Sequence, residues 1–103
     1  MFFIHRHNPY PLRRSDLQPH VLDREALLYD EKRKTTHRLN DTAFFIWQHC
    51  DATKTAADIA RLMTETYNAP VGQIEADVQN AIDVMTRYHL LKRCSRPRQE
   101  AQV

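Results

Sequence analysis

The sequence predicts an α+β domain in which a three-stranded antiparallel sheet precedes a three-helix bundle. Two patterns predict it. Between His20 and Asn40, short runs alternate between apolar and polar residues, as half-buried strands do. From Asp41 onward, apolar residues recur every three or four positions, as on one face of a helix. The junction Leu39-Asn40-Asp41-Thr42 contains helix-capping residues and no glycine, so we expect a strand to lead directly into a helix.

Length and composition fit one small domain. The chain has 103 residues, of which 42% are apolar and 27% charged. It contains no run of about 18 apolar residues that could span a bilayer, so we expect no membrane partner. The amino end, MFFIHRHNPYPLRR, reaches His5 and Arg6 too early for the apolar core of a secretory signal, and we expect a cytoplasmic protein. A net charge of +2 does not favour a nucleic-acid partner.

Three regions are expected along the chain. Residues 1–19 contain three of the five prolines and no sustained periodicity, which indicates an irregular N-terminal arm that folds over the domain. Residues 20–92 form the domain itself. Residues 93–103 are polar and contain a proline, which is typical of a flexible C-terminal tail.

Three short strands are expected in the first half of the domain. Their sequences are HVLDRE (20–25), ALLYDE (26–31) and KTTHRLN (34–40). The polar residues 31–34 are expected to form the turn between the last two strands. An antiparallel meander fits these short connections best.

The capping residues predict where the first two helices begin. Asn40 or Asp41 can accept a hydrogen bond from the free amides of a first turn, so a helix is expected from there to about Cys50. Thr53 or Thr55 is expected to cap a second helix in the same way.

A proline predicts the end of the second helix and the start of the third. The second helix is expected to end at Asn68-Ala69-Pro70, because proline disfavours helical geometry in the residue before it. The third helix is expected from about Gly72 to His89. It carries two apolar stripes, rotated by roughly 60 to 100° from each other. The first stripe comprises Ile74, Val78, Ile82, Met85 and His89, and the second comprises Ala81, Val84, Tyr88 and Leu91. The core covers one stripe, and a partner could cover the other.

No catalytic constellation is found in the sequence. His49 and Cys50 are adjacent, so their side chains point about 100° apart on a helix. Cys50 and Cys94 lack the spacing of a metal or redox site, and free thiols are expected. The single glycine, Gly72, is too few for a glycine-rich phosphate loop. We therefore expect neither an enzyme nor a bound metal or cofactor.

Several motifs together resemble a known family. They are the aliphatic-Tyr-Asp of Leu27 to Asp30, the turn Leu39 to Ala43, the Ile46-Trp47 pair, the helix-turn-helix of Thr55 to Tyr67, the helix start Glu75 to Val78 and the closing Leu90-Leu91. In this order they resemble the PqqD family, small peptide-binding proteins of pyrroloquinoline quinone biosynthesis. The same domain is the recognition element of other pathways for ribosomally made, modified peptides. The resemblance spans residues 20–92, although CDATKT stands after the first helix where Asp-Gly is more usual.

The resemblance implies a winged-helix-like domain that binds the leader segment of a precursor peptide and does no chemistry itself. It would present the peptide to a modifying enzyme, in the quinone pathway a radical S-adenosylmethionine enzyme. An edge strand over residues 34–39 would accept the peptide as an added strand. The expected peptide-binding residues are Thr35, His37, Arg38 and Leu39 in that strand and Asp77, Ala81, Val84, Arg87 and Tyr88 on the third helix.

Other interpretations remain open from the sequence. A winged-helix DNA-binding module would use the helices between residues 55 and 89, although Glu75, Asp77 and Asp83 suit a polyanion poorly. A structural subunit of a larger enzyme complex would use the same second stripe. The N-terminal arm or a second subunit could also cover Val84 and Tyr88. An unoccupied edge strand can pair with its symmetry mate, which would give a homodimer.

Overall fold

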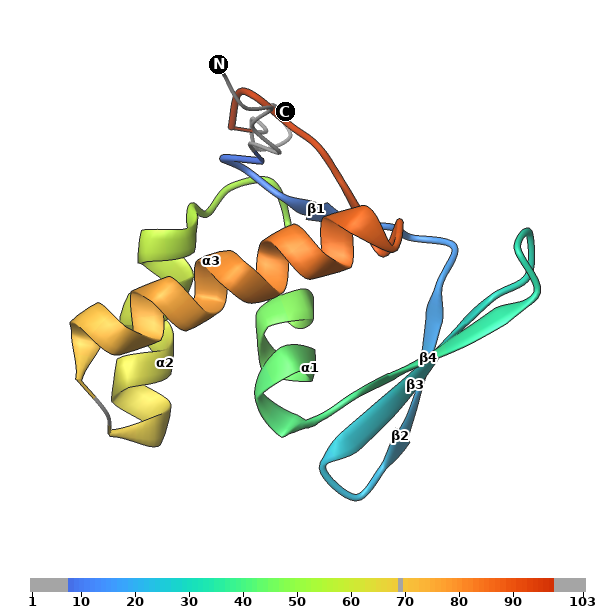
Figure 1. Ribbon diagram of the computed structural model, residues 1–103, viewed down its shortest axis with the longest axis horizontal. Coiled ribbons are helices and arrows are strands. Elements are labelled where there is room, and N and C mark those ends of the chain that lie inside the picture. Colours follow the sequence, from blue (N-terminus) through green and yellow to red (C-terminus); the bar gives the residue numbers. More distant parts are fainter. Residues whose placement is uncertain (1–7, 69, 98–103) are drawn as a thin grey trace, which may run out of the picture.

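A computed structural model describes residues 8–68 and 70–97 of the chain (Figure 1). Its elements are β1 (Leu12–Arg13), β2 (Gln18–Leu22), β3 (Glu25–Asp30), β4 (Thr35–Leu39), α1 (Asp41–Gln48), α2 (Ala56–Tyr67), α3 (Val71–Arg87) and β5 (Leu91–Lys92). The strands β2, β3 and β4 form an antiparallel sheet in that order, and β1 pairs with β5. The predicted α+β fold, a three-stranded antiparallel sheet before three helices, is confirmed.

Two tight turns set the register of the larger sheet. A two-residue turn at Asp23-Arg24 joins β2 to β3, and Asp23 adopts a φ of 63°. Asp tolerates this left-handed region better than most residues do. The first two predicted strands, 20–25 and 26–31, are therefore wrong in their boundary, because loose alternation does not reveal a turn without glycine. The turn at residues 31–34 lies where it was predicted and ends at Lys34, with a φ of 56°.

The helix caps follow the local sequence signals. The side chain of Asn40 accepts a hydrogen bond of 2.9 Å from the amide of Ala43 and caps α1. Thr55 caps α2, and the side chain of Asp58 returns a bond to the Thr55 amide, which completes a capping box. Asn68 ends α2 in the left-handed region, with a φ of 52°. None of the helices in the described residues is long and apolar enough to cross a membrane.

One hydrophobic core joins the larger sheet to the helices. α1 packs against β3 and β4, and α2 packs along α3 (Figure 1). The core comprises Leu17, Leu28, Leu39, Ile46, Trp47, Cys50, Ile59, Ala60, Met63, Ile74, Val78, Ile82, Met85, Leu90 and Leu91. The first predicted stripe of α3 therefore faces the core, except His89, which is exposed because the helix ends two residues before it.

We expected an irregular arm over residues 1–19, and the described part of this segment contains β1 and the start of β2. β1 pairs with β5 so that Leu12 lies opposite Lys92, and Leu17 is buried in the core. Pro19 lies in β2, opposite Leu28. Proline is compatible with an edge strand when its missing amide would face outward, so it did not mark a loop here. Residues 1–7 lie outside the described residues.

Asn8 connects the start of the described chain to α3 and to the segment after β5. Its buried side-chain amide donates to the Thr86 hydroxyl at 3.0 Å and to the Lys92 carbonyl at 3.2 Å. The backbone amide of Cys94 donates to the Asn8 carbonyl oxygen at 3.1 Å. Cys94, the second residue of the expected tail 93–103, is thus bonded to the domain, and residues 98–103 lie outside the described part of the chain.

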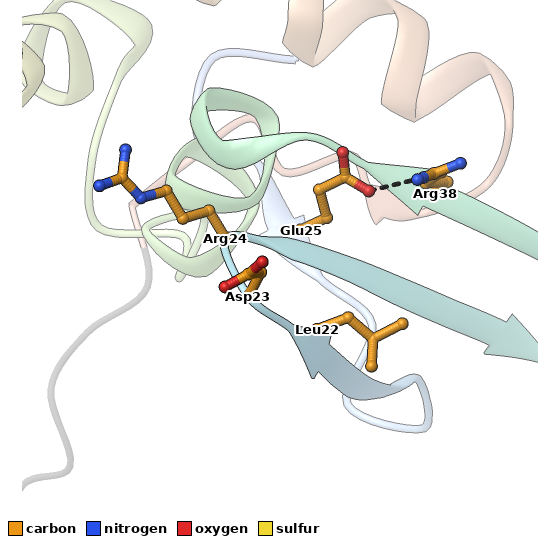
Figure 2. A pocket seen from close by; sticks show the side chains of 5 residues that line it. All are labelled: Leu22, Asp23, Arg24, Glu25 and Arg38. Atoms are coloured by element: carbon orange, nitrogen blue, oxygen red, sulfur yellow. Dashed lines mark hydrogen bonds and ion pairs between the residues drawn. The ribbon is translucent and has the colours of Figure 1, made fainter.

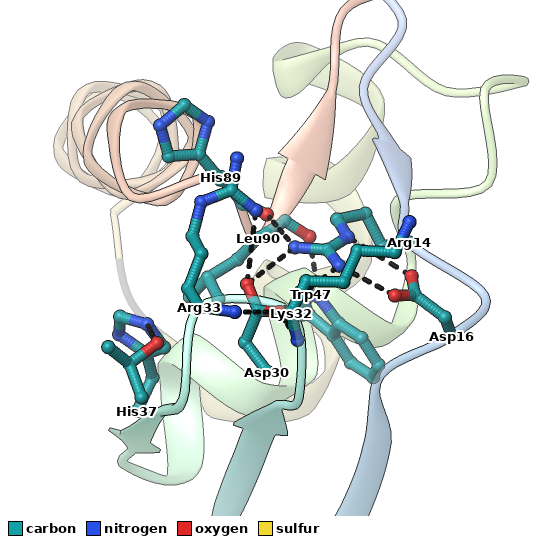
Figure 3. Close-up of polar contacts among 10 residues, drawn as sticks. Arg14, Asp16, Asp30, Lys32, Arg33, His37, Trp47, His89 and Leu90 are labelled. Atoms are coloured by element: carbon teal, nitrogen blue, oxygen red, sulfur yellow. Dashed lines mark hydrogen bonds and ion pairs between the residues drawn. The ribbon is translucent and has the colours of Figure 1, made fainter.

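A buried ion pair connects β3, the segment before β2 and the end of α3 (Figure 3). The guanidinium of Arg14 donates to the Asp30 carboxylate at 2.8 Å and to the His89 carbonyl at 3.0 Å. The same guanidinium pairs with Asp16 at 2.6 Å, and Arg33 reaches Asp30 at 3.2 Å. The Asp30 side chain is fully buried, so these contacts replace the water that the carboxylate loses on folding.

The ion pair changes the protonation of its acidic members. The hydrogen bond from Arg14 holds the pKa of Asp30 well below its usual range, although burial acts in the opposite direction. The same guanidinium lowers the pKa of Asp16. Since both shifts favour the ionised carboxylates in the folded state, the network stabilises the fold at neutral pH.

We expect Asp30→Asn to lower the melting temperature at pH 7, because the buried Arg14 guanidinium loses its anionic partner. The folded-state pKa of Asp30 is lowered, so its contribution is present above the unfolded value of about 4 and is lost as the pH falls below it. The wild type should therefore lose more stability between pH 7 and pH 3 than the variant does. Thermal melts across this range measure both effects.

Asp23→Asn is the matched control, since it makes the same chemical change in an exposed turn. It should keep the wild-type dependence on pH. An Asp30→Asn protein that melts at the wild-type temperature at both pH values would contradict the role given to this ion pair.

Candidate functional site

The two edges of the larger sheet differ in the hydrogen bonds that they can still make. The two-residue turn after β2 is closed by the pair Leu22–Glu25, whose backbones bond to each other. Along an antiparallel ladder from such a pair, hydrogen-bonded and non-hydrogen-bonded pairs alternate. Pro19 and Val21 therefore point their backbone groups outward at the β2 edge. Since Pro19 has no amide hydrogen, this edge lacks a donor at its centre and is a poor template for another strand.

The β4 edge has no such defect. By the same alternation, Thr35, His37 and Leu39 bond to β3, which leaves the amides and carbonyls of Thr36 and Arg38 pointing outward. β4 ends the strand order of the sheet within the described residues. This edge therefore offers two donors and two acceptors in the geometry of a strand.

The side chains of the inner face of β4 point toward the helices. The aromatic ring of His37 lies 5.9 Å from the ring of Tyr88, so it connects β4 with the end of α3. Thr35 is exposed, and its hydroxyl oxygen lies 3.2 Å from the His37 ring. Leu39 is only 6% exposed and belongs to the core. Leu39 therefore exposes little surface for the direct peptide contact that we predicted. Thr35 and His37 are on the side of β4 that faces α3.

Arg38 lies on the opposite face of the sheet from these residues. Its side chain donates to the Glu25 carboxylate at 2.7 Å and is largely solvent-exposed. Figure 2 shows this ion pair beside an open hollow of about 670 Å³ at the β2–β3 turn. The structure does not bring the Arg38 side chain together with α3. Its backbone, however, is part of the free edge.

Four of the predicted residues follow one flank of α3. Asp77, Ala81, Val84 and Tyr88 are spaced by four, three and four positions, which places them on one side of the helix. Ala81 and Val84 are half-buried, and Tyr88 remains 54% exposed just after the last turn. Arg87 is exposed but lies about 100° around the helix from Tyr88, so the structure separates it from this flank.

A cavity of about 350 Å³ lies beyond the end of β4, and sequence reasoning missed it. Its walls and rim are formed by Asn40, Thr42, Ala43, Ile46, Met63, Tyr67, Ile74, Asp77 and Ala81. These residues come from α1 and its N-cap, the second half of α2 and the part of α3 between Ile74 and Ala81. The apolar positions carried a helical signal, but their meeting point depends on how three helices pack. The volume falls within the range of small ligand pockets.

The rim of this cavity is partly fixed by a hydrogen bond. The Tyr67 hydroxyl donates to the Asp41 carboxylate at 3.1 Å. Burial and this bond both raise the pKa of Tyr67, so the hydroxyl remains a donor. We call the surface formed by the β4 edge, the α3 flank and this cavity the β4–α3 groove.

The thiol of Cys50 lies in the core and does not line this groove. Cys50 is fully buried, its thiol donates to the Ile46 carbonyl at 3.1 Å, and burial raises the pKa of this thiol to about 12. Within residues 8–68 and 70–97, no group of three His, Cys, Asp or Glu side chains is placed to hold a metal ion. The arrangement is suited to binding an extended chain.

Comparisons with solved structures identify the same fold. TbiB1, solved in complex with the TbiA(beta) leader peptide, superposes with a TM-score of 0.69 over 79% of this chain and 94% of TbiB1, at 17% identity. A PqqD truncation of Methylobacterium extorquens PqqCD, described as a stand-alone recognition element for ribosomally synthesised and post-translationally modified peptides, superposes with a TM-score of 0.67. That match covers 81% of this chain and 88% of the other, at 22% identity.

The family comparison covers most of the domain. A search of curated proteins finds no significant match. The family model described as coenzyme PQQ synthesis protein D (PqqD) matches residues 25–91, which span β3 through the start of β5. The chain therefore belongs to the PqqD family.

Proposed function

We propose that this protein binds the leader segment of a ribosomally made precursor peptide and has no catalytic activity of its own. The observation that carries the proposal is the β4 edge, where, among the residues that the structure describes, Thr36 and Arg38 present unpaired backbone groups on the side of the sheet near the α3 flank. Membership of the PqqD family supports it, and so does the fold shared with TbiB1, which was solved with a leader peptide.

The proposed mode of binding is strand addition. A leader segment in extended conformation pairs with Thr36 and Arg38 as a fourth strand, and its alternate side chains enter the β4–α3 groove. The backbone bonds supply affinity for any extended chain, and the groove supplies selection among sequences. Because the inner face of β4 is anchored through Leu39 in the core, the edge is already ordered before the peptide arrives. Binding therefore orders only the peptide.

The proposed partners are the precursor peptide and the enzyme that modifies it in the cytoplasm. In the quinone pathway of this family the modifying enzyme is a radical S-adenosylmethionine enzyme, and we extend that pairing to this chain. DNA binding is not supported, because α3 exposes the acidic side chains of Glu75 and Asp77. A structural subunit would bury the same groove without binding a free peptide.

A proline at the β4 edge should abolish strand addition. Thr36→Pro removes an outward amide but no bond to β3, so we expect leader binding to weaken by at least about tenfold, or 1.4 kcal/mol. Fluorescence anisotropy with labelled leader peptides from precursor genes beside this gene measures the affinity. Thermal melts check that the variant remains folded.

Val21→Pro is the control, because it makes the same change at an outward position of the β2 edge. We expect wild-type affinity from it. Equal affinity of both proline variants for the leader would exclude β4 as the binding edge. If β4 instead paired with the β4 of a second copy, the protein would be a dimer. Thr36→Pro would dissociate that dimer, whereas the leader peptide would not.

A charge placed on the α3 flank should separate binding from stability. We expect Val84→Asp to abolish leader binding while the melting temperature changes little, since Val84 is half-buried and borders the groove. Asn80→Asp adds the same charge on an exposed position of α3 and should bind normally. Isothermal titration and thermal melts of both variants provide the comparison. Loss of stability parallel to the loss of binding would make Val84 a core residue instead.

A further inference from the structure

We propose that the ligand runs antiparallel to β4 and carries a large apolar or aromatic side chain about six residues before an acidic one. This inference rests on the proposed function and names the class of peptide that the groove selects. It follows from the two ends of the groove, which differ in shape and in charge.

The end of the groove near the start of α1 is built for an apolar side chain. The cavity begins at Asn40, directly after β4, and its floor contains the apolar side chains of Ile46, Met63 and Ile74. An extended peptide paired with Arg38 passes its opening. The acidic side chains of Asp77 on the rim and Asp41 nearby disfavour an acidic residue here. We therefore place the large apolar side chain of the peptide, its anchor, at this end and the acidic side chain of the peptide at the other end.

The opposite end of the groove is basic. The turn of residues 31–34 carries three cationic side chains and one acidic one. Arg33 pairs with Asp30, whereas Lys32 and Lys34 are exposed and have no ion-pair partner in the part of the chain that the structure describes. The charge of Lys32 also acts on Asp16, so an acidic side chain of the peptide at this end would meet Lys34 and compete with Asp16 for Lys32.

The buried ion pair keeps this turn near the end of α3. Arg14 bonds to Asp30, directly before the turn, and to the carbonyl of His89, directly after α3. Figure 3 shows Arg33 and His89 on the same side of this network. The base of the turn therefore lies near the end of α3, whereas its tip projects beyond that end (Figure 1).

The spacing of the two peptide side chains follows from strand geometry. Six positions separate Asn40 from Lys34, which is about 20 Å at the rise of a strand. An added strand covers that distance with about the same number of residues. Antiparallel pairing is the more stable arrangement per residue and matches the rest of the sheet. The anchor then precedes the acid in the sequence of the peptide.

Selection of random 16-residue peptides displayed on phage tests the inference, because such a library favours no particular ligand. Panning is done against the wild type and three variants. Thr36→Pro blocks the edge, Ala81→Leu fills the cavity, and the double variant Lys32→Glu/Lys34→Glu reverses the charge of the turn. Ala76→Leu on the exposed side of α3 and Arg61→Glu on α2 are the matched controls. The most enriched peptide is then synthesised in its own and in reversed sequence order, and both affinities are measured.

We expect enriched peptides that carry the anchor before the acid, and a forward peptide that binds at least about tenfold tighter than its reverse. Ala81→Leu and the double lysine variant should each weaken binding by roughly tenfold, and the controls by less than about twofold. Equal binding of both sequence orders, or no loss in these variants, would overturn the inference. If Thr36→Pro still abolished binding in that case, the proposed function would stand. Failure to enrich any peptide that depends on Thr36 would overturn both.

Discussion

The contact of Arg14 with Asp30 and with the carbonyl of His89 determines the shape of the groove. Asp30 ends β3 and so positions the turn that starts β4, while His89 follows the last turn of α3. One guanidinium therefore holds the two borders of the groove at a set separation. The contact between His37 and Tyr88 depends on that separation. A fully buried carboxylate fixes this geometry because it has no alternative partner in solvent.

The two edges of the larger sheet differ in how readily they can pair with another chain. A sheet of three strands has two edges, and either one can recruit another chain. Pro19 removes a donor from the β2 edge, and the β4 edge lies beside a helix flank with Tyr88 at its end. In the proposed function, this asymmetry directs strand addition to the β4 edge.

Local signals made much of the fold predictable, whereas long-range pairing did not. The caps at Asn40 and Thr55 could be read from the sequence because each bond spans only three residues. The pairing of β1 with β5 joins residues 12 and 92, and nothing near Leu12 signals a partner so distant. The buried role of Arg14 was equally invisible, because a surface arginine has the same sequence signature.

The outline of the candidate site was predictable where it depends on local geometry. The spacing of Asp77, Ala81, Val84 and Tyr88 identified the flank of α3, since helical geometry is regular. Arg38 was predicted as a flanking contact, and its side chain lies on the face of the sheet opposite His37, because which face of a strand is buried depends on packing against the core. Thr36 was missed, since an outward backbone group leaves no trace in the side-chain pattern. The cavity required three helices to be placed together.

Amide hydrogen exchange at the β4 edge is the most direct measure of the central claim that this edge receives the peptide. The amides of Thr36 and Arg38 should exchange rapidly in the free protein and become protected at saturating leader peptide. The amide of Val21, which faces outward at the β2 edge, should be unchanged. Protection at Val21 instead, or tight binding with no protection at Thr36 and Arg38, would contradict strand addition at β4.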